Sequence, residues 1–329
     1  MKLRHLKEWN RSRPTLRTGQ SIIATSFRYF AAVAERSSIR AAARTLNVAP
    51  SAINRQILMI ERALGIELFE RVGRTLRISE AGQILLQNVR QSQRGFEESL
   101  SAIAALRGLQ RGKIAVATVE SVSVSLLPDV LAAFAAQYPG IEITVNVASS
   151  QAVSAFVRAG EADIGFTFNP GSLEGLRAVY ERDLPLGALV APSHPLAKRR
   201  RVPLADCLKY PIALPMQGLS LRAILEAAIA RMPQPPRAAF EANSLRLMSA
   251  LALRGRCIAF QTAIGIEKEL SAKSLVLIPL SDPLLPLDRF TIVEPAGRKP
   301  SLAAAALLRQ IIAQLSSEPR RRSGRARLK

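Results

Sequence analysis

The chain has 329 residues, more than one typical domain of roughly 100–200 residues, and its 48% hydrophobic content excludes a mostly disordered protein. It carries 46 Lys+Arg against 25 Asp+Glu, a formal net charge of +21, which favours a polyanionic partner. The sequence has no run of about 18 apolar residues, so no membrane-spanning helix is predicted.

The excess positive charge is concentrated at the two ends of the sequence. Residues 1–24 contain six basic residues and one acidic residue, and residues 318–329 contain the same numbers. We interpret 1–24 as a basic N-terminal extension and 318–329 as a basic disordered tail, both suited to salt-sensitive contact with phosphates. The basic start is not followed by an apolar run of about 7–15 residues, so a secretory signal is not predicted and a cytoplasmic location is expected.

Residues 38–64 have the pattern of two helices joined by a tight turn. Ser38 is a predicted N-cap, Asn47 is typical of a helix end, and Pro50 suits the first turn of the next helix. The predicted buried positions recur at helical spacing: Ile39, Ala42, Ala43 and Leu46 in the first helix, and Ile53, Ile57, Ile60 and Leu64 in the second. An upstream helix containing Phe27 and Phe30 completes a predicted helix-turn-helix unit. A small alanine-rich helical bundle with a solvated polar face is the alternative.

Residues 72–79 predict a short hairpin beside these helices. Gly73 is placed at the bend, and arginines stand at positions 71, 74 and 77. A basic hairpin next to a recognition helix can grip the flanking DNA backbone or reach an adjacent minor groove. The hairpin therefore favours the DNA-binding interpretation over a plain helical bundle.

A long amphipathic helix is predicted over residues 83–109, which contain no proline. A helix of about 25 residues extends roughly 37 Å. Such a helix needs a partner for its apolar face, either the rest of its own chain or a second copy.

From Gly112 onward the pattern alternates between strands and helices. Predicted strands lie at 113–118, 141–147 and 162–168, with helices at 126–137 and 151–159, which predicts a parallel sheet covered on both faces. A second set comprises strands at 186–191, 211–214 and 257–261 and helices at 219–231 and 244–254. Strands near 275–279 and 289–294 and a helix at 301–315 are predicted to return to the first sheet, with crossovers near Asn169 and Gln261-Thr262.

Hydroxyl side chains follow the first two strands of this region, where helices begin. Free N–H groups at a helix start suit a carboxylate, so residues 120–125 and 148–151 are predicted to form a small-molecule site. Serine is also a favoured N-cap, and capping alone is the alternative. Glu120 would oppose an anionic ligand there unless its side chain points away.

Neither catalytic chemistry nor a cofactor or metal is predicted. The chain has only two histidines, and no common hydrolase, metalloprotease or phosphate-loop motif occurs. Cys207 and Cys257 are expected to be buried structural thiols, with a disulfide or a redox sensor as the alternative.

The N-terminal pattern resembles the LysR-type transcriptional regulators. The residues that carry the resemblance extend over about sixty positions: 27–35, 38–43, Leu46, 50–53, 55–57, Glu61, Leu64, Gly65, 68–71, Arg74 and 79–82. Two positions depart from the usual pattern, since Asn54 stands where serine is most frequent and Ala49 where a capping Ser or Thr is frequent. Asn54 remains able to pair with a base edge, best with adenine, so the departure concerns the target sequence and not DNA binding.

The resemblance implies a multidomain fold. It implies a winged helix-turn-helix domain at 25–82, a linker and dimerisation helix at 83–111, and a two-lobed α/β domain similar to type 2 periplasmic binding proteins at 112–317. Lobe I is expected at 112–169 and 263–317, and lobe II at 170–262.

The resemblance also implies partners and contact residues. The expected partners are a second copy in a homodimer or homotetramer, near-palindromic double-stranded DNA, a small-molecule effector and RNA polymerase, with no membrane. The expected DNA contacts are Arg40, Pro50, Ser51, Asn54, Arg55, Arg74 and Arg77. The expected effector contacts are Ser121, Ser123, Ser149, Ser150 and Thr262. The alternative is a solute-binding protein whose main role is ligand capture and whose DNA contact is only nonspecific.

Overall fold

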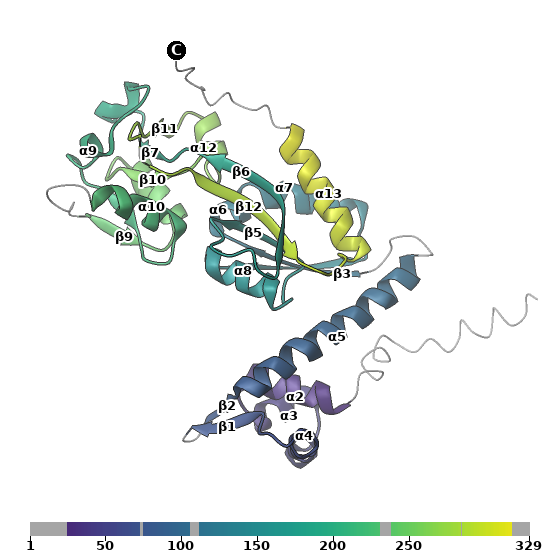
Figure 1. Ribbon diagram of the computed structural model, residues 1–329. Helices are drawn as coiled ribbons and strands as arrows, with labels where there is room; N and C mark the ends of the chain where they lie inside the picture. The colour runs from purple at the N-terminus through teal and green to yellow at the C-terminus, as the bar shows by residue number, and fades with distance from the viewer. Residues whose placement is uncertain (1–24, 73–74, 106–111, 231–237, 284, 318–329) are drawn as a thin grey trace, which may run out of the picture. The chain divides into compact units, whose positions relative to one another are not determined.

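The computed structural model describes residues 25–72, 75–105, 112–230, 238–283 and 285–317 (Figure 1). The predicted N-terminal extension and basic tail lie outside these residues. The chain forms two compact units, Met1–Leu100 and Ser101–Lys329, which are described separately. Within the described residues, no helix is long and apolar enough to cross a membrane.

The first unit has the predicted order of three helices, a hairpin and a long helix. Its elements are α2 (Thr25–Arg36), α3 (Ile39–Leu46), α4 (Pro50–Leu64), β1 (Phe69–Val72), β2 (Thr75–Ile78) and α5 (Glu80–Ala105). Strands β1 and β2 pair antiparallel, which confirms the hairpin, and its bend at 73–74 lies outside the described residues. Helix α5 begins a turn earlier than predicted, and its predicted end near Leu109 also lies outside them.

The core of this unit is formed by the apolar residues predicted at helical spacing. Phe30, Ile53 and Leu68 are fully buried, and the rings of Phe30 and Phe69 lie 5.4 Å apart. The prediction that Leu64 is buried is wrong, because its side chain is 54% exposed. Residues 63–67 are all exposed, so the last turn of α4 extends past the core that buries Ile53 and Ile57.

The second unit is built around a five-stranded sheet of order β4-β3-β5-β12-β6. Its strands are β3 (Gly112–Thr118), β4 (Ile141–Val147), β5 (Ile164–Phe168), β6 (Leu176–Leu184) and β12 (Asp288–Pro295). The helices packed with it are α6 (Glu120–Val124), α7 (Leu126–Gln137), α8 (Ser150–Arg158) and α13 (Leu302–Ser317). Figure 1 shows α13 beside α7, and residues of both helices belong to one core with the buried strands.

The direction of the last strand corrects the prediction of a parallel sheet. Strands β3, β4 and β5 are parallel, as predicted, but β12 runs antiparallel to both β5 and β6. The chain leaves this sheet after β6 and returns to it through β12, which runs in the direction opposite to the other strands. The first sheet is therefore mixed.

A second, smaller group of strands forms the other lobe. It comprises a three-stranded sheet of order β10-β7-β11 and the pair β8-β9. The strands are β7 (Gly187–Val190), β8 (Ala213–Pro215), β9 (Phe240–Ala242), β10 (Ala259–Gln261) and β11 (Val276–Pro279). The helices are the 3-10 turn η2 (Pro195–Lys198), α9 (Leu204–Cys207), α10 (Ser220–Ile229), α11 (Leu245–Leu253) and α12 (Glu267–Ser271).

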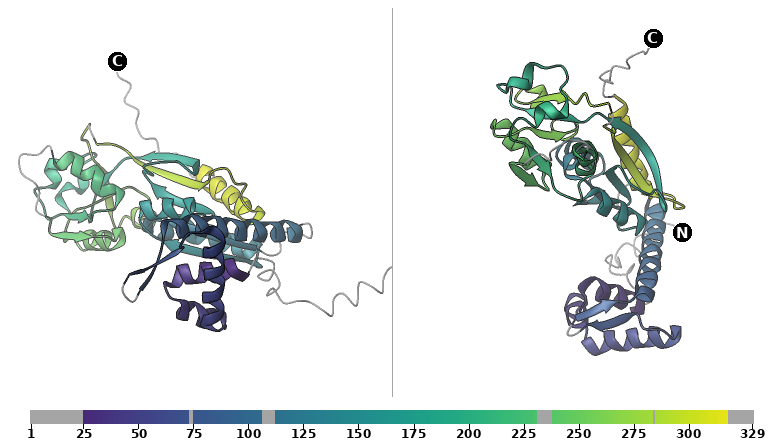
Figure 2. Two further views of the ribbon diagram at one scale, coloured as in Figure 1. Left: turned by 60° about the horizontal axis from the view of Figure 1, so that its bottom comes forward. Right: turned by 60° about the vertical axis from the view of Figure 1, so that its left-hand side comes forward.

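Strand pairing also corrects the predicted lobe limits. Strand β6 pairs with β12 in the first sheet, and β11 pairs with β7 in the second instead of returning to the first. Lobe I therefore comprises 112–184 and 288–317, and lobe II comprises 187–279. The crossovers lie at 185–186 and 280–287, not at Asn169 and Gln261-Thr262. In Figure 2 the green segments of lobe II gather at one end of the first sheet in both views.

Candidate nucleic-acid interface and effector cleft

The exposed face of α4 carries the predicted base-contacting residues. Ser51, Asn54 and Arg55 are exposed, whereas Ile53 and Ile57 of the same helix are buried. The spacing of three and four residues places the three polar side chains on one face. Pro50 occupies the first turn, as predicted, and Ala49 makes no side-chain cap bond to the helix.

The turn before α4 is held by the predicted caps of α3. The Ser38 hydroxyl accepts a hydrogen bond from the Ala41 N–H at 3.3 Å, and Asn47 has the left-handed backbone conformation with φ of 53°. The Val48 N–H then bonds to the Ala43 carbonyl at 3.1 Å. These local bonds fix where α4 begins relative to α3, on which Arg40 is exposed.

Of the two hairpin arginines expected to contact DNA, one lies within the described residues. Arg77 is exposed on β2, opposite Glu70 of β1, while Arg74 lies outside the described residues. The hairpin is joined to α4, because the Leu68 N–H donates to the Glu61 carboxylate at 2.8 Å.

A cleft of about 550 Å³ lies between the lobes of the second unit. Of the predicted effector contacts, Ser121, Ser149, Ser150 and Thr262 line it. Ser123 is not among the lining residues, and its hydroxyl donates to the Glu120 carbonyl at 2.7 Å. The α6 turn directs Ser121 toward the cleft and Ser123 back onto its own backbone.

The serines at the start of α8 also have structural roles. Ser149 caps the helix by accepting from the Ala152 N–H at 3.3 Å. The Ser150 hydroxyl accepts from the Phe168 N–H at 3.3 Å, and the Thr167 hydroxyl donates to the Ser150 carbonyl at 3.1 Å. Capping and cleft lining therefore coincide at these residues.

Glu120 was predicted to lie at the site, but the structure gives its side chain a different role. Glu120 was expected only as a hindrance to anions, and its carboxylate points to the start of α11. It accepts from the Ser244 hydroxyl at 2.8 Å and from the Leu245 N–H at 2.7 Å. The negative charge thus lies at the positive end of a helix in the other lobe, which stabilises it. The polar lining residues that were not predicted come from chain segments distant in sequence: Gln217, Ser220, Asn243, Ser244 and Asp288.

Asp288 is a buried carboxylate at the start of β12. Its side chain accepts from the Asn169 amide at 2.7 Å and from the Ser220 hydroxyl. Burial raises the pKa of Asp288 to about 7, because desolvation of the charged form outweighs these two hydrogen bonds.

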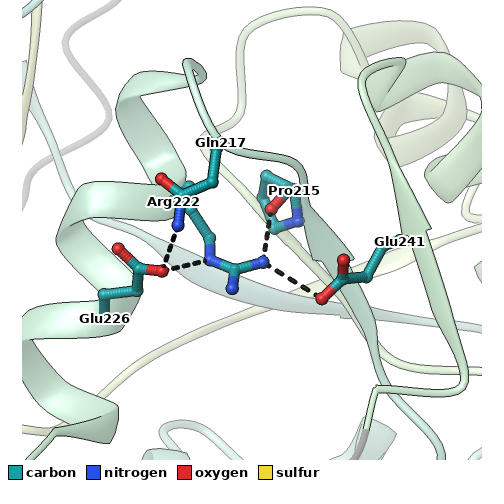
Figure 3. Close-up of polar contacts among 5 residues, drawn as sticks. All are labelled: Pro215, Gln217, Arg222, Glu226 and Glu241. Atoms are coloured by element: carbon teal, nitrogen blue, oxygen red, sulfur yellow. Dashed lines mark hydrogen bonds and ion pairs between the residues drawn. The ribbon is translucent and has the colours of Figure 1, made fainter.

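Arg222 on α10 organises the segment that carries Gln217 (Figure 3). Its guanidinium bonds to Glu226 at 2.7 Å, to Glu241 at 3.2 Å and to the Pro215 carbonyl at 3.0 Å. The Gln217 amide donates to the same Glu226 carboxylate at 2.7 Å. The positive charge of Arg222 is therefore already balanced by two carboxylates.

Both cysteines are buried and free, as expected for structural thiols. Desolvation raises the pKa of Cys207 to about 12 and that of Cys257 to about 11. Because the thiolate is the reactive form, these thiols are poorly suited to redox sensing.

A winged helix-turn-helix unit and a two-lobed α/β unit with a ligand-sized cleft, present in one chain, define a DNA-binding regulator with its own ligand-binding domain. Residues 24–83 match the bacterial regulatory helix-turn-helix proteins of the lysR family, and residues 107–316 match the LysR substrate binding domain. The chain belongs to the LysR family of transcriptional regulators.

Similar proteins agree with this assignment. The chain is 28% identical over 300 residues to a probable RuBisCO transcriptional regulator of Synechocystis sp., covering 89% of this chain and 86% of the relative. It is 27% identical over 260 residues to the HTH-type transcriptional regulator CbbR of Rhodospirillum rubrum, covering 79% and 85% of the two chains.

Solved structures share the fold. Full-length OxyR from Pseudomonas aeruginosa superposes with a TM-score of 0.66 at 16% identity, over 89% of this chain and 94% of that one. Full-length CbnR, solved in complex with its target DNA, gives a TM-score of 0.57 at 20% identity, over 88% and 98%.

Proposed function

We propose that this regulator reads a near-palindromic DNA site as a homodimer or homotetramer in the cytoplasm. Ser51, Asn54 and Arg55 would contact base edges in the major groove, with Arg40 and Pro50 beside them. Arg74 and Arg77 of the hairpin would contact the DNA backbone. The observation that carries this proposal is the exposed polar face of α4 on a helix whose other face is buried.

A second copy would supply the symmetry that a palindromic site requires. Helix α5 extends over 26 residues and has an exposed Ile84 among its apolar residues. A long helix with an exposed apolar residue is suited to pairing with the α5 helix of a second chain, which supports the proposed dimer.

We propose that the cleft binds a small-molecule effector through Ser121, Ser149, Ser150 and Thr262. Its volume of about 550 Å³ falls in the range of small-molecule sites. Binding would change the populations of lobe arrangements and so alter DNA bending and the recruitment of RNA polymerase.

The test is selection of bound fragments from the organism's genomic DNA by the purified full chain, at two salt concentrations. A shared, near-palindromic motif that persists at the higher salt is the expected result. Binding without a motif, abolished as salt rises, would mean nonspecific phosphate contact and would favour a solute-binding protein instead.

A further inference from the structure

The charged groups that line the cleft are negative in the part of the chain that the structure describes. The ionisable lining side chains are Glu120 and Asp288, and the other polar ones are hydroxyls and amides. No described Lys, Arg or His lines the cleft. When ionised, these two carboxylates repel an anion and attract a cation.

Three arginines adjoin lining residues along the chain, but none of them contributes a positive charge to the cleft wall. Arg222 is bound to Glu226 and Glu241, as Figure 3 shows. Arg289 is paired with Asp183 at 2.7 Å. Arg246 lines an adjoining cavity of about 200 Å³, which shares Glu120, Ser121 and Leu245 with the cleft, and it is not among the residues that line the cleft itself.

Glu120 already has its partners, which leaves Asp288 as the carboxylate able to take a ligand cation. The Glu120 carboxylate is occupied by the Ser244 hydroxyl and by the N–H groups of Leu245 and Arg246, at 2.8, 2.7 and 3.4 Å. Asp288 is only 1% exposed, and its side-chain partners Asn169 and Ser220 are neutral. A cation placed beside a buried carboxyl group favours its charged form, and no protein cation already has this role among the described side-chain partners of Asp288.

We propose that the effector of this regulator carries an ammonium or guanidinium group that pairs with Asp288 in the cleft. The proposal rests on the proposed function, in which this cleft is the effector site, and it replaces the carboxylate ligand that the helix starts alone suggested. The surrounding groups, Ser149, Ser150, Gln217, Ser220, Asn243 and Thr262, would hydrogen-bond the rest of the molecule. Asp288 begins the strand that returns from lobe II, and Ser220 belongs to lobe II, so a cation held there would contact both lobes.

The direct test measures binding of four compounds of similar chain length to the full chain by titration calorimetry. The compounds are putrescine, agmatine, 4-aminobutyrate and succinate. We expect binding by at least one compound that carries an ammonium or guanidinium group, and none by succinate. Equal or tighter binding of succinate, or binding by none of the four, would overturn the proposal.

Asp288→Asn keeps the shape of the side chain and removes its charge. We expect it to weaken binding of the amine at least tenfold, with a melting temperature at or above that of the wild type, because a desolvated charge has been removed. Asp206→Asn is the matched control, since Asp206 pairs with Lys209 in lobe II and does not line the cleft. Unchanged binding by Asp288→Asn would contradict the proposed pairing.

The pH dependence in the wild type is a second readout, which does not depend on the folding of a variant. Because Asp288 has a pKa of about 7 and must ionise to pair with a cation, amine affinity should rise about tenfold from about pH 6 to about pH 8. The charged groups around it are held by other partners: Arg289 by Asp183, and Glu120 by α11. An affinity that is constant or falls over this interval would contradict the pairing.

The two proposals fail in different ways. A genomic motif with no binding of the amine compounds would overturn only the ligand class. Binding of an amine with no genomic motif would overturn the sequence-specific regulator while leaving the cleft assignment intact.

Discussion

At the scale of single residues, position and environment decide the role more than residue type does. Ser38 and Ser149 both cap helices, but only Ser149 also lines the cleft. Glu120 and Asp288 are both cleft carboxylates, yet one is held by helix N–H groups and the other is buried among neutral groups. The effect of a substitution should therefore depend on the local surroundings of the residue that it replaces.

Arg55→Ala should lower specific DNA affinity by about 1–3 kcal/mol if Arg55 reads a base. The measurement is the ratio of operator to random-DNA affinity at fixed salt. Arg44→Ala is the matched control, since Arg44 is exposed on α3 and is not an expected DNA contact. An unchanged ratio in Arg55→Ala would remove Arg55 from the base contacts.

Gly82→Ala should destabilise the DNA-binding unit by about 3 kcal/mol. A Cβ at this position would lie 2.2 Å from the Leu68 carbonyl oxygen and 2.6 Å from Ile78 Cγ1, where neither backbone nor hairpin can yield easily. Hydrogen exchange of α2–α4 measures the effect. Gly95→Ala on the same helix has no atom within 4 Å of the added Cβ and should be neutral or stabilising.

Asp288 should make the second unit less stable as pH rises. Its folded pKa of about 7 lies above the ordinary 3.8, so the folded chain retains a proton that the unfolded chain has released. This stabilisation is complete below about pH 4 and is removed as pH rises through about 7, on the order of 4 kcal/mol in all. Relative to Asp288→Asn, the urea midpoint of the wild type should fall between about pH 5 and about pH 8. A constant difference would argue against the raised pKa.

At the scale of elements, one interaction joins the two lobes through a helix end. The carboxylate of Glu120 in lobe I substitutes for a bound anion at the start of α11 in lobe II. The hydroxyl of Ser244 caps the same helix by accepting from the Leu247 N–H at 3.1 Å. The start of α11 is therefore stabilised from both lobes.

Glu120→Gln should loosen the first turn of α11. The amide keeps one acceptor but has no charge, which should cost about 1 kcal/mol and speed amide exchange at residues 245–246 severalfold. Glu142→Gln, which alters an exposed pair with Lys113, serves as the control. Unchanged exchange at these amides would show that Glu120 does not hold the helix end.

At the scale of the whole molecule, net charge and domain organisation are both expected to contribute to DNA binding. The chain has two compact units and a net charge of +21, with basic residues concentrated in its terminal segments. Sequence-specific contacts are proposed for the first unit and ligand contacts for the second. The basic segments should add affinity that does not depend on DNA sequence.

Replacing residues 318–329 with a neutral tail of equal length should weaken binding to random DNA. The plot of log affinity against log salt should become less steep by about 0.9 for each phosphate that the basic tail had neutralised. Discrimination between operator and random DNA should rise, because nonspecific affinity falls. An identical slope would mean that the tail does not bind phosphates.

The amino-acid sequence by itself determined the features that depend on short-range interactions. The helix-turn-helix, its caps at Ser38 and Asn47, the hairpin and the apolar stripe of α4 through Ile60 were all predicted, because each is set by neighbours a few residues apart. The helix starts that carry serine residues at the cleft were predicted for the same reason. Leu64 was misplaced because local periodicity does not tell where the core ends.

Only the tertiary structure decided which distant segments meet. Strand partners exchange hydrogen bonds across many residues, so neither β6 in the first sheet nor β11 in the second could be assigned from local pattern. The electrostatics of the cleft depend on the same long-range pairing. Glu120 meets α11, Asp288 meets Asn169, and Arg222 meets Glu241, so charges that look unpaired in the sequence are neutralised or isolated by residues far along the chain.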